Sequence, residues 1–301
     1  MMKKSKVYSL IAIVAVMVAL IVFGSFWDYE IAEALYLGQL PSENIFGIIF
    51  AFIGIIPTFV GWSFLGAGIL CLAKRTKLAK VHRRLLIALC VLLFVLSFFY
   101  FCNTLLMVNA NAFSVHWAVA YSIGILTLAG AAHLGYKLSE KSTNPELLKK
   151  LLILTAVSLL TLIIISSTKS IMDRPRFRFV LESGNPDYFR NWWQSGSALK
   201  ESLGTGAISD EFSSFPSGHS AYSAFAIFIF PALADFTEGL KKFRAPLFAL
   251  GFVWWGSTAF SRLSIGAHYL SDVATAGLIP IAAYVVVSAL AKNFISRKNK
   301  L

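Results

Sequence analysis

The chain has 301 residues, of which 57% are hydrophobic and 14% are charged, and its mean hydropathy is +0.71. This composition excludes a water-soluble domain of this size and places the chain in a lipid bilayer. The net charge of +12 does not indicate nucleic acid as a partner, because the basic residues are spread over several short loops instead of forming one patch.

Apolar runs long enough to cross a bilayer recur along the chain. A hydrocarbon core about 30 Å thick requires roughly 20 apolar residues per helix. The runs that approach this length cover residues 7–27, 46–73, 85–108, 116–136, 150–168, 218–236, 246–261 and 272–291. The first run follows several lysines and lacks a clear cleavage site, so it is interpreted as a retained signal anchor. The predicted fold is an all-α, polytopic membrane helical bundle of about eight transmembrane helices.

The loops between these runs predict an orientation. Basic residues concentrate in alternate loops, at residues 74–84, 137–150, 241–244 and 297–300. By the positive-inside rule this side is cytoplasmic, and both termini are expected there, with a bacterial plasma membrane as the expected location. The first outside segment carries Asp28, Glu30 and Glu33 but no Lys or Arg. These carboxylates are expected to be solvated in a loop.

A long segment at residues 169–215 is predicted to lie outside although it is rich in cations. Its basic residues are Lys169, Arg174, Arg176, Arg178, Arg190 and Lys200. Long loops escape the charge rule, so anion binding is the simplest reason for a cationic cluster at the end of a span. An aromatic stretch within it includes Trp192 and Trp193, and fits either an interfacial belt or a lid that contacts a ligand.

Three groups of polar residues stand at the ends of spans on this outer face. They are Lys169 with Arg174 and Arg176; Pro216, Ser217, Gly218 and His219; and Ser261, Arg262, His268 and Asp272. Each group suits a phosphate, because Arg and Lys supply charge and several donors, and a Pro-Ser-Gly-His turn entering a helix leaves backbone N–H groups unpaired. His268 and Asp272 are four residues apart, so on a helix they share a face, where the carboxylate accepts from one ring nitrogen and leaves the other free to attack.

These motifs resemble those of the type 2 phosphatidic acid phosphatases, a family that shares its core with vanadium haloperoxidases and glucose 6-phosphatase. The Pro-Ser-Gly-His motif and the Ser-Arg, His and Asp motif of that family match fully at residues 216–219 and 261–272. The motif of Lys, six residues and Arg-Pro matches in part, since Lys169 and Arg176 have its spacing but a Phe replaces the proline. A second Arg-Pro pair begins at Arg174. A spacing of seven residues is close to two helical turns, which favours Arg176 as the phosphate ligand.

The resemblance implies a phosphatase that hydrolyses a lipid phosphate or diphosphate at the outer face through a phosphohistidine, without a metal or other cofactor. His268 would be the nucleophile, Asp272 would hold its ring, and His219 would protonate the leaving group. The groups that would stabilise the transition state are Lys169, Arg176, Ser217, Gly218 and Arg262. Although His and Asp are ordinary zinc ligands, these cations would repel a metal ion.

One membrane domain is expected, in which residues 1–110 form N-terminal transmembrane helices and residues 111–301 form the phosphatase core with motifs at 169–176, 216–219 and 261–272. The resemblance implies a six-helix phosphatase core, so two of the eight predicted helices would be additional ones at the N-terminal end. Three alternatives stay open: phosphate transfer, hydrolysis of a soluble phosphate ester, and a non-catalytic transporter or anion-binding protein. Transport is disfavoured because the span interiors carry few charges and no internal repeat is visible. The expected partners are the lipid phosphate and the bilayer, and the oligomeric state is left open.

Overall fold

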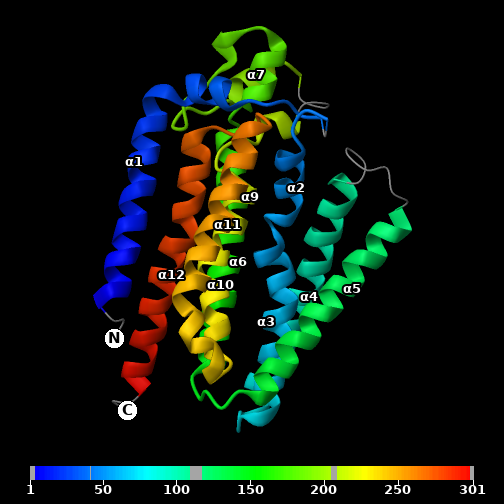
Figure 1. Ribbon diagram of the computed structural model, residues 1–301, viewed down its shortest axis with the longest axis vertical. Helices are drawn as coiled ribbons and strands as arrows, with labels where there is room; N and C mark the ends of the chain where they lie inside the picture. Colours follow the sequence, from blue (N-terminus) through cyan, green and yellow to red (C-terminus); the bar gives the residue numbers. More distant parts are fainter. Residues whose placement is uncertain (1–3, 41, 109–116, 205–208, 299–301) are drawn as a thin grey trace. The chain divides into compact units, whose positions relative to one another are not determined.

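The computed structural model describes residues 4–40, 42–108, 117–204 and 209–298 (Figure 1). Within these ranges the chain is helical and contains no strand, which confirms the predicted all-α fold. The predicted domain boundary at residues 110–111 and the end of the basic segment 297–300 lie outside the described residues. The chain divides into two compact units, and each unit is built from segments that are far apart in the sequence.

Long helices account for most of the described chain (Figure 1). They are α1 (Lys4–Leu35), α3 (Ile56–Arg75), α4 (Lys80–Val108), α5 (Trp117–Lys141), α6 (Leu147–Met172), α11 (Arg244–Ser264) and α12 (Leu270–Lys298). The shorter α-helices are α2 (Ile45–Ile53), α7 (Phe177–Ser183), α8 (Ser197–Ser202), α9 (Gly218–Ala224) and α10 (Ala226–Ala232). The 3-10 helices are η2 (Pro186–Tyr188), η3 (Ser209–Phe212), η4 (Leu233–Asp235) and η5 (Glu238–Phe243).

Six helical segments of the described chain are long and apolar enough to cross a membrane, so the chain is an integral membrane protein. They are Ile11–Leu35, Ile45–Arg75, Lys80–Leu106, Trp117–Lys141, Leu147–Ser183 and Leu270–Asn293. The predicted count of eight is not confirmed. Of the two remaining predicted spans, residues 218–236 are divided among α9, α10 and η4, with Pro231 inside α10, and residues 246–261 lie within α11.

The second of the two units, unit 2, comprises Ala51–Leu160, Tyr222–Gly256 and Ala283–Leu301. In it α3 packs against α4 and α5, and the approach of α3 to α5 requires a small residue, since a Cβ on Gly135 would lie 2.1 Å from the carbonyl oxygen of Phe64. Two cations of unit 2 are paired with Asp235, whose carboxylate accepts from Lys150 at 2.7 Å and from Arg244 at 2.6 Å. Its apolar core includes Leu65, Ile69, Leu151, Val157, Phe225 and Ile229.

The other unit, unit 1, comprises Met1–Phe50, Thr161–Ala221 and Ser257–Ala282. It brings α1 together with the segment that follows α6 and with the turn between α11 and α12. The contact is largely aromatic, because the fully buried rings of Phe177 and Tyr269 pack with Tyr29, Tyr36 and Phe189. Such edge-on ring pairs add to the stabilisation that burial of their area provides.

Helix α1 continues beyond the predicted first span and includes residues that were predicted to form an outside loop. Trp27 interrupts the helical geometry, with φ −134° and ψ 22°, and the helix then runs on to Leu35. The prediction that Asp28 is solvated is wrong, because this residue is only 2% exposed and forms a buried salt bridge. Glu30 and Glu33 are exposed, as predicted.

Helix α6 ends at Met172, where the chain turns sharply. Asp173 adopts a left-handed conformation with φ 43°. The N–H of Gly196 donates to the carbonyl oxygen of Met172 at 2.8 Å, and a Cβ at this glycine would lie only 2.0 Å from the carbonyl oxygen of Asp173. The predicted helical relation between Lys169 and Arg176 therefore does not exist, since no helix joins them.

Candidate active site

Every residue that the sequence predicts as a ligand contact lies in unit 1, and most of these residues stand at helix ends. Lys169 is in the last turn of α6, Arg174 and Arg176 follow it, and Trp192 and Trp193 come after α7. Ser217 precedes α9, Gly218 and His219 begin it, Arg262 is in the last turn of α11, His268 precedes α12, and Asp272 is in its first turn. The predicted site residues of unit 1 therefore lie mainly at helix ends.

The ring of His268 is 2% exposed and is held through one nitrogen. Its Nδ1 lies 2.7 Å from the carbonyl oxygen of Ser214 and 3.6 Å from a carboxylate oxygen of Asp272. Because a carbonyl oxygen only accepts, Nδ1 carries the proton and Nε2 carries the lone pair. Burial lowers the pKa of His268 well below its ordinary value, against the opposing effect of Asp272. The neutral ring therefore presents a nucleophilic nitrogen.

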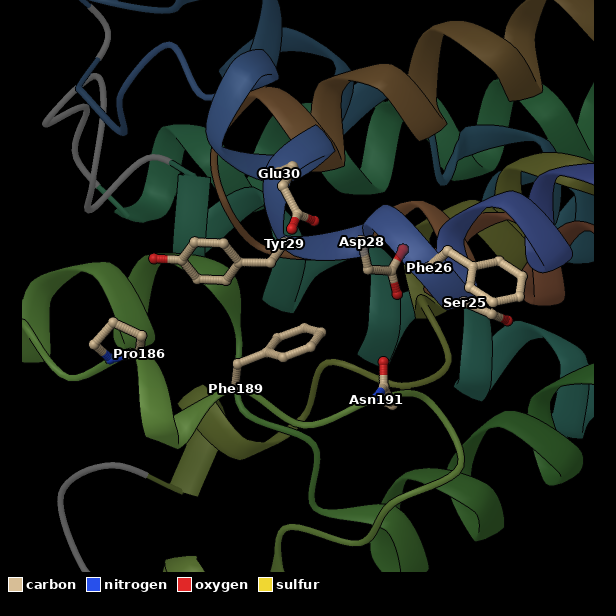
Figure 2. A pocket seen from close by; sticks show the side chains of 8 residues that line it. All are labelled: Ser25, Phe26, Asp28, Tyr29, Glu30, Pro186, Phe189 and Asn191. Atoms are coloured by element: carbon tan, nitrogen blue, oxygen red, sulfur yellow. The ribbon is translucent and has the colours of Figure 1, made fainter.

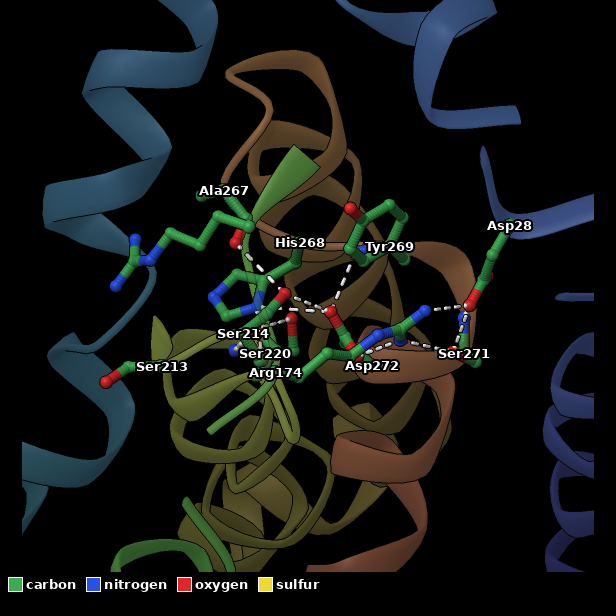
Figure 3. A network of polar contacts seen from close by, with 12 residues as sticks. Asp28, Arg174, Ser213, Ser214, Ser220, Ala267, His268, Tyr269, Ser271 and Asp272 are labelled. Carbon is green, nitrogen blue, oxygen red and sulfur yellow. Dashed lines mark hydrogen bonds and ion pairs between the residues drawn. The ribbon is translucent and has the colours of Figure 1, made fainter. Parts of the chain in front are cut away.

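Asp272 is fully buried and both of its carboxylate oxygens are engaged (Figure 3). One oxygen accepts from Nη1 of Arg174 at 2.5 Å, and the other accepts from Oγ of Ser214 at 2.5 Å and from the N–H of Tyr269 at 2.9 Å. The last bond caps the first turn of α12. His268 precedes this helix, so the prediction that the two residues share a helix face is wrong. The cap brings the carboxylate to the ring.

Arg174 is fully buried, and each of its three side-chain nitrogens is hydrogen-bonded. Nε donates to the carbonyl oxygen of Arg190 at 2.8 Å, and Nη1 donates to Asp272 and, at 2.9 Å, to Oγ of Ser271. Nη2 donates to Asp28 at 2.9 Å. The donors of this arginine are directed at protein groups and not at a ligand.

Arg176 is the arginine of the pair that keeps a donor free. It is 8% exposed, and its Nε and Nη2 donate to the carbonyl oxygen and the carboxylate of Asp210 at 2.9 and 2.8 Å. The remaining nitrogen, Nη1, makes no hydrogen bond with the described residues. The side chain of Asp210 is 74% exposed, so the partner of Arg176 is a solvated carboxylate that an anion can replace.

Arg262 differs from both of these arginines. It is 5% exposed, and its buried Nε has no hydrogen-bond partner among the residues that the structure describes. No carboxylate within that part of the chain forms an ion pair with its guanidinium. Burying a guanidinium without a counter-ion costs several kcal/mol, and a bound anion would offset that cost. The surroundings of Arg262 are those of an anion-binding group.

His219 is the second imidazole of the candidate site, and cations surround it. It is half-buried in the first turn of α9, and its ring forms no hydrogen bond with described residues. The charged and ring groups that act on it electrostatically are Arg262, His268, Arg176 and Lys169. Nζ of Lys169 donates to the carbonyl oxygen of Ser213. The structure therefore gathers two imidazoles and three cations in one site.

Ser217 and Gly218 contribute to this site in different ways. The N–H of Ser217 donates to the carbonyl oxygen of Asp272 at 3.2 Å, and its hydroxyl donates to Oγ of Ser220 at 2.9 Å. A phosphate would have to compete with these bonds for Ser217. Gly218 opens α9, where backbone N–H groups have no partner within the helix.

Trp192 and Trp193 are divided between protein and surface. Nε1 of Trp192 donates to Oγ of Ser25 at 2.9 Å and its ring stacks on Phe215, whereas Trp193 is 52% exposed. A cavity of about 330 Å³ lies between α1 and this segment (Figure 2). Its lining residues are Ser25, Phe26, Asp28, Tyr29, Glu30, Pro186, Phe189 and Asn191. The predicted catalytic and phosphate-binding residues are not part of this lining.

The side chains that commonly bind metals are dispersed in the described part of the chain. No three His, Cys, Asp or Glu residues there lie close enough to share a metal ion. The nearest carboxylate to His268 is Asp272, which is already committed to Arg174 and Ser214. The expectation of a metal-independent site stays a prediction.

Residues 150–296 match the family model described as the PAP2 superfamily. This segment belongs to the PAP2 superfamily. The PAP2 segment contains all three motif groups, and membership indicates a phosphatase-type hydrolase in a membrane-embedded helical protein. No curated protein and no solved structure was found to match the chain.

Two residues that shape the PAP2 site were not predicted from the sequence. Ser214 holds both His268 and Asp272, but no motif singles it out, since its role depends on where one carbonyl and one hydroxyl fall in space. Asp28 lies outside the PAP2 segment and contacts Arg174. A signal for Asp28 did exist, because a carboxylate that continues an apolar helical run is costly without a partner.

Proposed function

We propose that this protein is a metal-independent phosphatase that hydrolyses a lipid phosphate or diphosphate through a phosphohistidine. One observation carries the proposal: Arg262, buried and without a counter-ion among the described residues, shares a site with His219 and His268. Two imidazoles beside an anion-binding group are the parts needed to attack phosphorus and to protonate a leaving group.

In the first step Nε2 of His268 attacks phosphorus. An N–P bond forms, the P–O bond to the leaving group breaks, and His219 gives a proton to the departing oxygen. Burial and the neighbouring cations lower the pKa of His219, so the negative charge of the bound phosphate is needed to keep this ring protonated. Asp272 offsets the positive charge that develops on the phosphorylated ring. Arg176 and Arg262, together with Lys169 and the N–H of Gly218, stabilise the extra negative charge on the phosphoryl oxygens.

In the second step water replaces the nitrogen. His219, now neutral, takes a proton from a water molecule, and that water attacks phosphorus while the N–P bond breaks. The products are inorganic phosphate, or the released phosphate of a diphosphate, and neutral His268. The two histidines thus return to their starting protonation states.

An amphiphilic substrate fits the position of these residues at the ends of membrane helices, because its tail can stay in the bilayer while its phosphate reaches the site. Candidates are phosphatidic acid, phosphatidylglycerol phosphate, undecaprenyl diphosphate and the phosphates of lipid A. The charges of the short loops support a site on the outer face of a bacterial plasma membrane with both termini in the cytoplasm.

A substrate panel in detergent tests the proposal. Phosphate release from these lipids is compared with release from water-soluble esters such as glycerol 3-phosphate and glucose 6-phosphate. We expect kcat/KM for one lipid to exceed that for the soluble esters. In a rapid-quench experiment with labelled substrate, the protein should carry acid-labile, alkali-stable phosphate that is absent from His268→Ala. Equal use of the soluble esters would contradict the lipid assignment, and label that persists in His268→Ala would contradict the phosphohistidine.

A further inference from the structure

Asp28 of α1 lies outside the PAP2 segment, yet buried polar contacts connect it to His268 (Figure 3). It accepts from Nη2 of Arg174 at 2.9 Å, and from the N–H of Ser271 at 2.9 Å and its hydroxyl. Arg174 in turn donates to Asp272 at 2.5 Å. The other oxygen of Asp272 accepts from Oγ of Ser214, and the carbonyl oxygen of Ser214 lies 2.7 Å from Nδ1 of His268. None of the links in this chain of contacts is exposed to solvent.

Asp28 determines how the guanidinium of Arg174 is oriented. A planar guanidinium is fixed when two of its nitrogens are held, and here Nη2 is held by Asp28 and Nε by the carbonyl oxygen of Arg190. The third nitrogen, Nη1, is then directed at Oδ1 of Asp272. As a result Oδ2 of Asp272 is left for the contacts near His268.

Asp28 also sets the charge beside the nucleophile. The side chains of Asp28, Arg174 and Asp272 are 1%, 0% and 0% exposed, so water and salt do not screen them. Two carboxylates and one guanidinium leave a net negative charge, and that charge can offset a positive phosphohistidine at His268. Without the Asp28 carboxylate, Arg174 would neutralise Asp272 by itself.

We propose that Asp28 is a positioning residue for the nucleophile: through Arg174 it orients Asp272 and keeps the negative charge of that carboxylate effective at His268. The inference rests on the proposed function and extends it to a helix that the PAP2 segment does not contain. Helix α1 thus takes part in the chemistry as well as in packing.

The first test replaces Asp28 with the isosteric Asn and uses Glu33→Gln as the matched control, since it removes one carboxylate from an exposed position of the same helix. For Asp28→Asn we expect kcat to fall about tenfold or more, which is the loss found when a residue that orients a metal ligand is removed from a metal site. KM should change much less, because the carboxylate of Asp28 is buried and bonded to Arg174 and Ser271. Glu33→Gln should match the parent. An unchanged kcat in Asp28→Asn, or an equal loss in Glu33→Gln, overturns the proposal.

A double-mutant cycle distinguishes positioning from a structural role. If Asp28 acts through Arg174, then Asp28→Asn should not lower kcat further in an Arg174→Met background. Losses that simply multiply would overturn the proposal. Should Asp28→Asn not fold, Ser271→Ala carries the test, since it removes one hydroxyl that donates to Asp28 and accepts from Arg174. It should lower kcat about threefold, in line with the loss of one buried hydrogen bond, and an unchanged kcat would overturn the proposal.

Binding of orthovanadate supplies a readout that does not depend on the choice of substrate, because five-coordinate vanadate imitates the phosphoryl group during transfer. It should bind Asp28→Asn about tenfold more weakly than the parent, the same loss as in kcat, and equal binding would overturn the proposal. The two hypotheses fail in different ways. If the parent protein releases phosphate from no ester of the panel, the proposed function fails. If the parent is active and Asp28→Asn equals it, only the role of Asp28 fails.

Discussion

Two buried arginines of unit 1, Arg174 and Arg262, have opposite surroundings. Arg174 donates to two carboxylates, a hydroxyl and a backbone carbonyl, whereas Nε of Arg262 has no partner in the described part of the chain. Removing a guanidinium from water costs several kcal/mol unless it is paired. The protein compensates this cost at one of the two positions and leaves it uncompensated at the other.

The difference separates a cation that is bonded to protein groups from one whose donors are available to a ligand. A cation whose nitrogens are all bonded holds its neighbours in place, as Arg174 holds Asp28 and Asp272. A cation that stays buried without a counter-ion is preorganised for negative charge on a ligand, at the expense of stability. Arg176 is intermediate, because its partner Asp210 is exposed.

The largest effect is expected at His268, the proposed nucleophile. His268→Ala should lower phosphate release by about 10⁴-fold or more, because it removes the nitrogen that forms the proposed covalent intermediate. Elution from a sizing column and the unfolding temperature in detergent should stay near those of the parent. Release at close to the parental rate would show that another residue attacks phosphorus.

A large loss is also expected when Arg262 is changed. Arg262→Lys should lower kcat/KM by about 10²-fold, because a point charge replaces the planar fork of donors that is proposed to bind the phosphoryl oxygens. The measurement is phosphate release over a range of substrate concentrations. Unaltered kinetics would mean that Arg262 does not contact the ligand. The distinction between Arg262 as a ligand-binding cation and Arg174 as a protein-bonded cation would then be wrong.

For stability, the change at Arg174 should matter more than the change at Arg262. Arg174→Met should lower the free energy of unfolding by about 3–5 kcal/mol, since it strands two buried carboxylates. The matched variant Arg262→Met should leave the stability of the ligand-free protein unchanged or raise it, because it removes an uncompensated cation. Both are measured by reversible unfolding in mixed detergent micelles. Equal shifts in the two variants would contradict the comparison.

The smallest effect is expected from metal removal. Because arginine and lysine side chains supply the positive charge of the site, dialysis against EDTA should leave phosphate release unchanged. The activity of treated and untreated protein is compared on the same lipid. If EDTA lowered phosphate release and a divalent ion restored it, a metal would supply the positive charge assigned to Arg262, and this result would contradict the proposed mechanism.

Several features of the fold were predictable because they depend on local chemistry. Apolar runs such as residues 85–108 and 150–168 predict membrane helices, and the described chain has helices there. The count of eight is not confirmed, and one of the predicted spans is interrupted by Pro231 and the short helices around it. The left-handed turn at Asp173 was not predictable, since it occurs where Gly196, distant in the sequence, approaches the backbone of Asp173.

The sequence by itself determined that this is a helical membrane protein with phosphatase motifs, because hydropathy and the order of reactive residues are properties of short stretches of chain. Only the tertiary structure decided which arginine is paired with carboxylates and which is not, and that Asp28 contacts Arg174. The physical reason is that these pairings join residues 146 and 98 positions apart. Their energies depend on burial and on partners that meet only when the chain has folded.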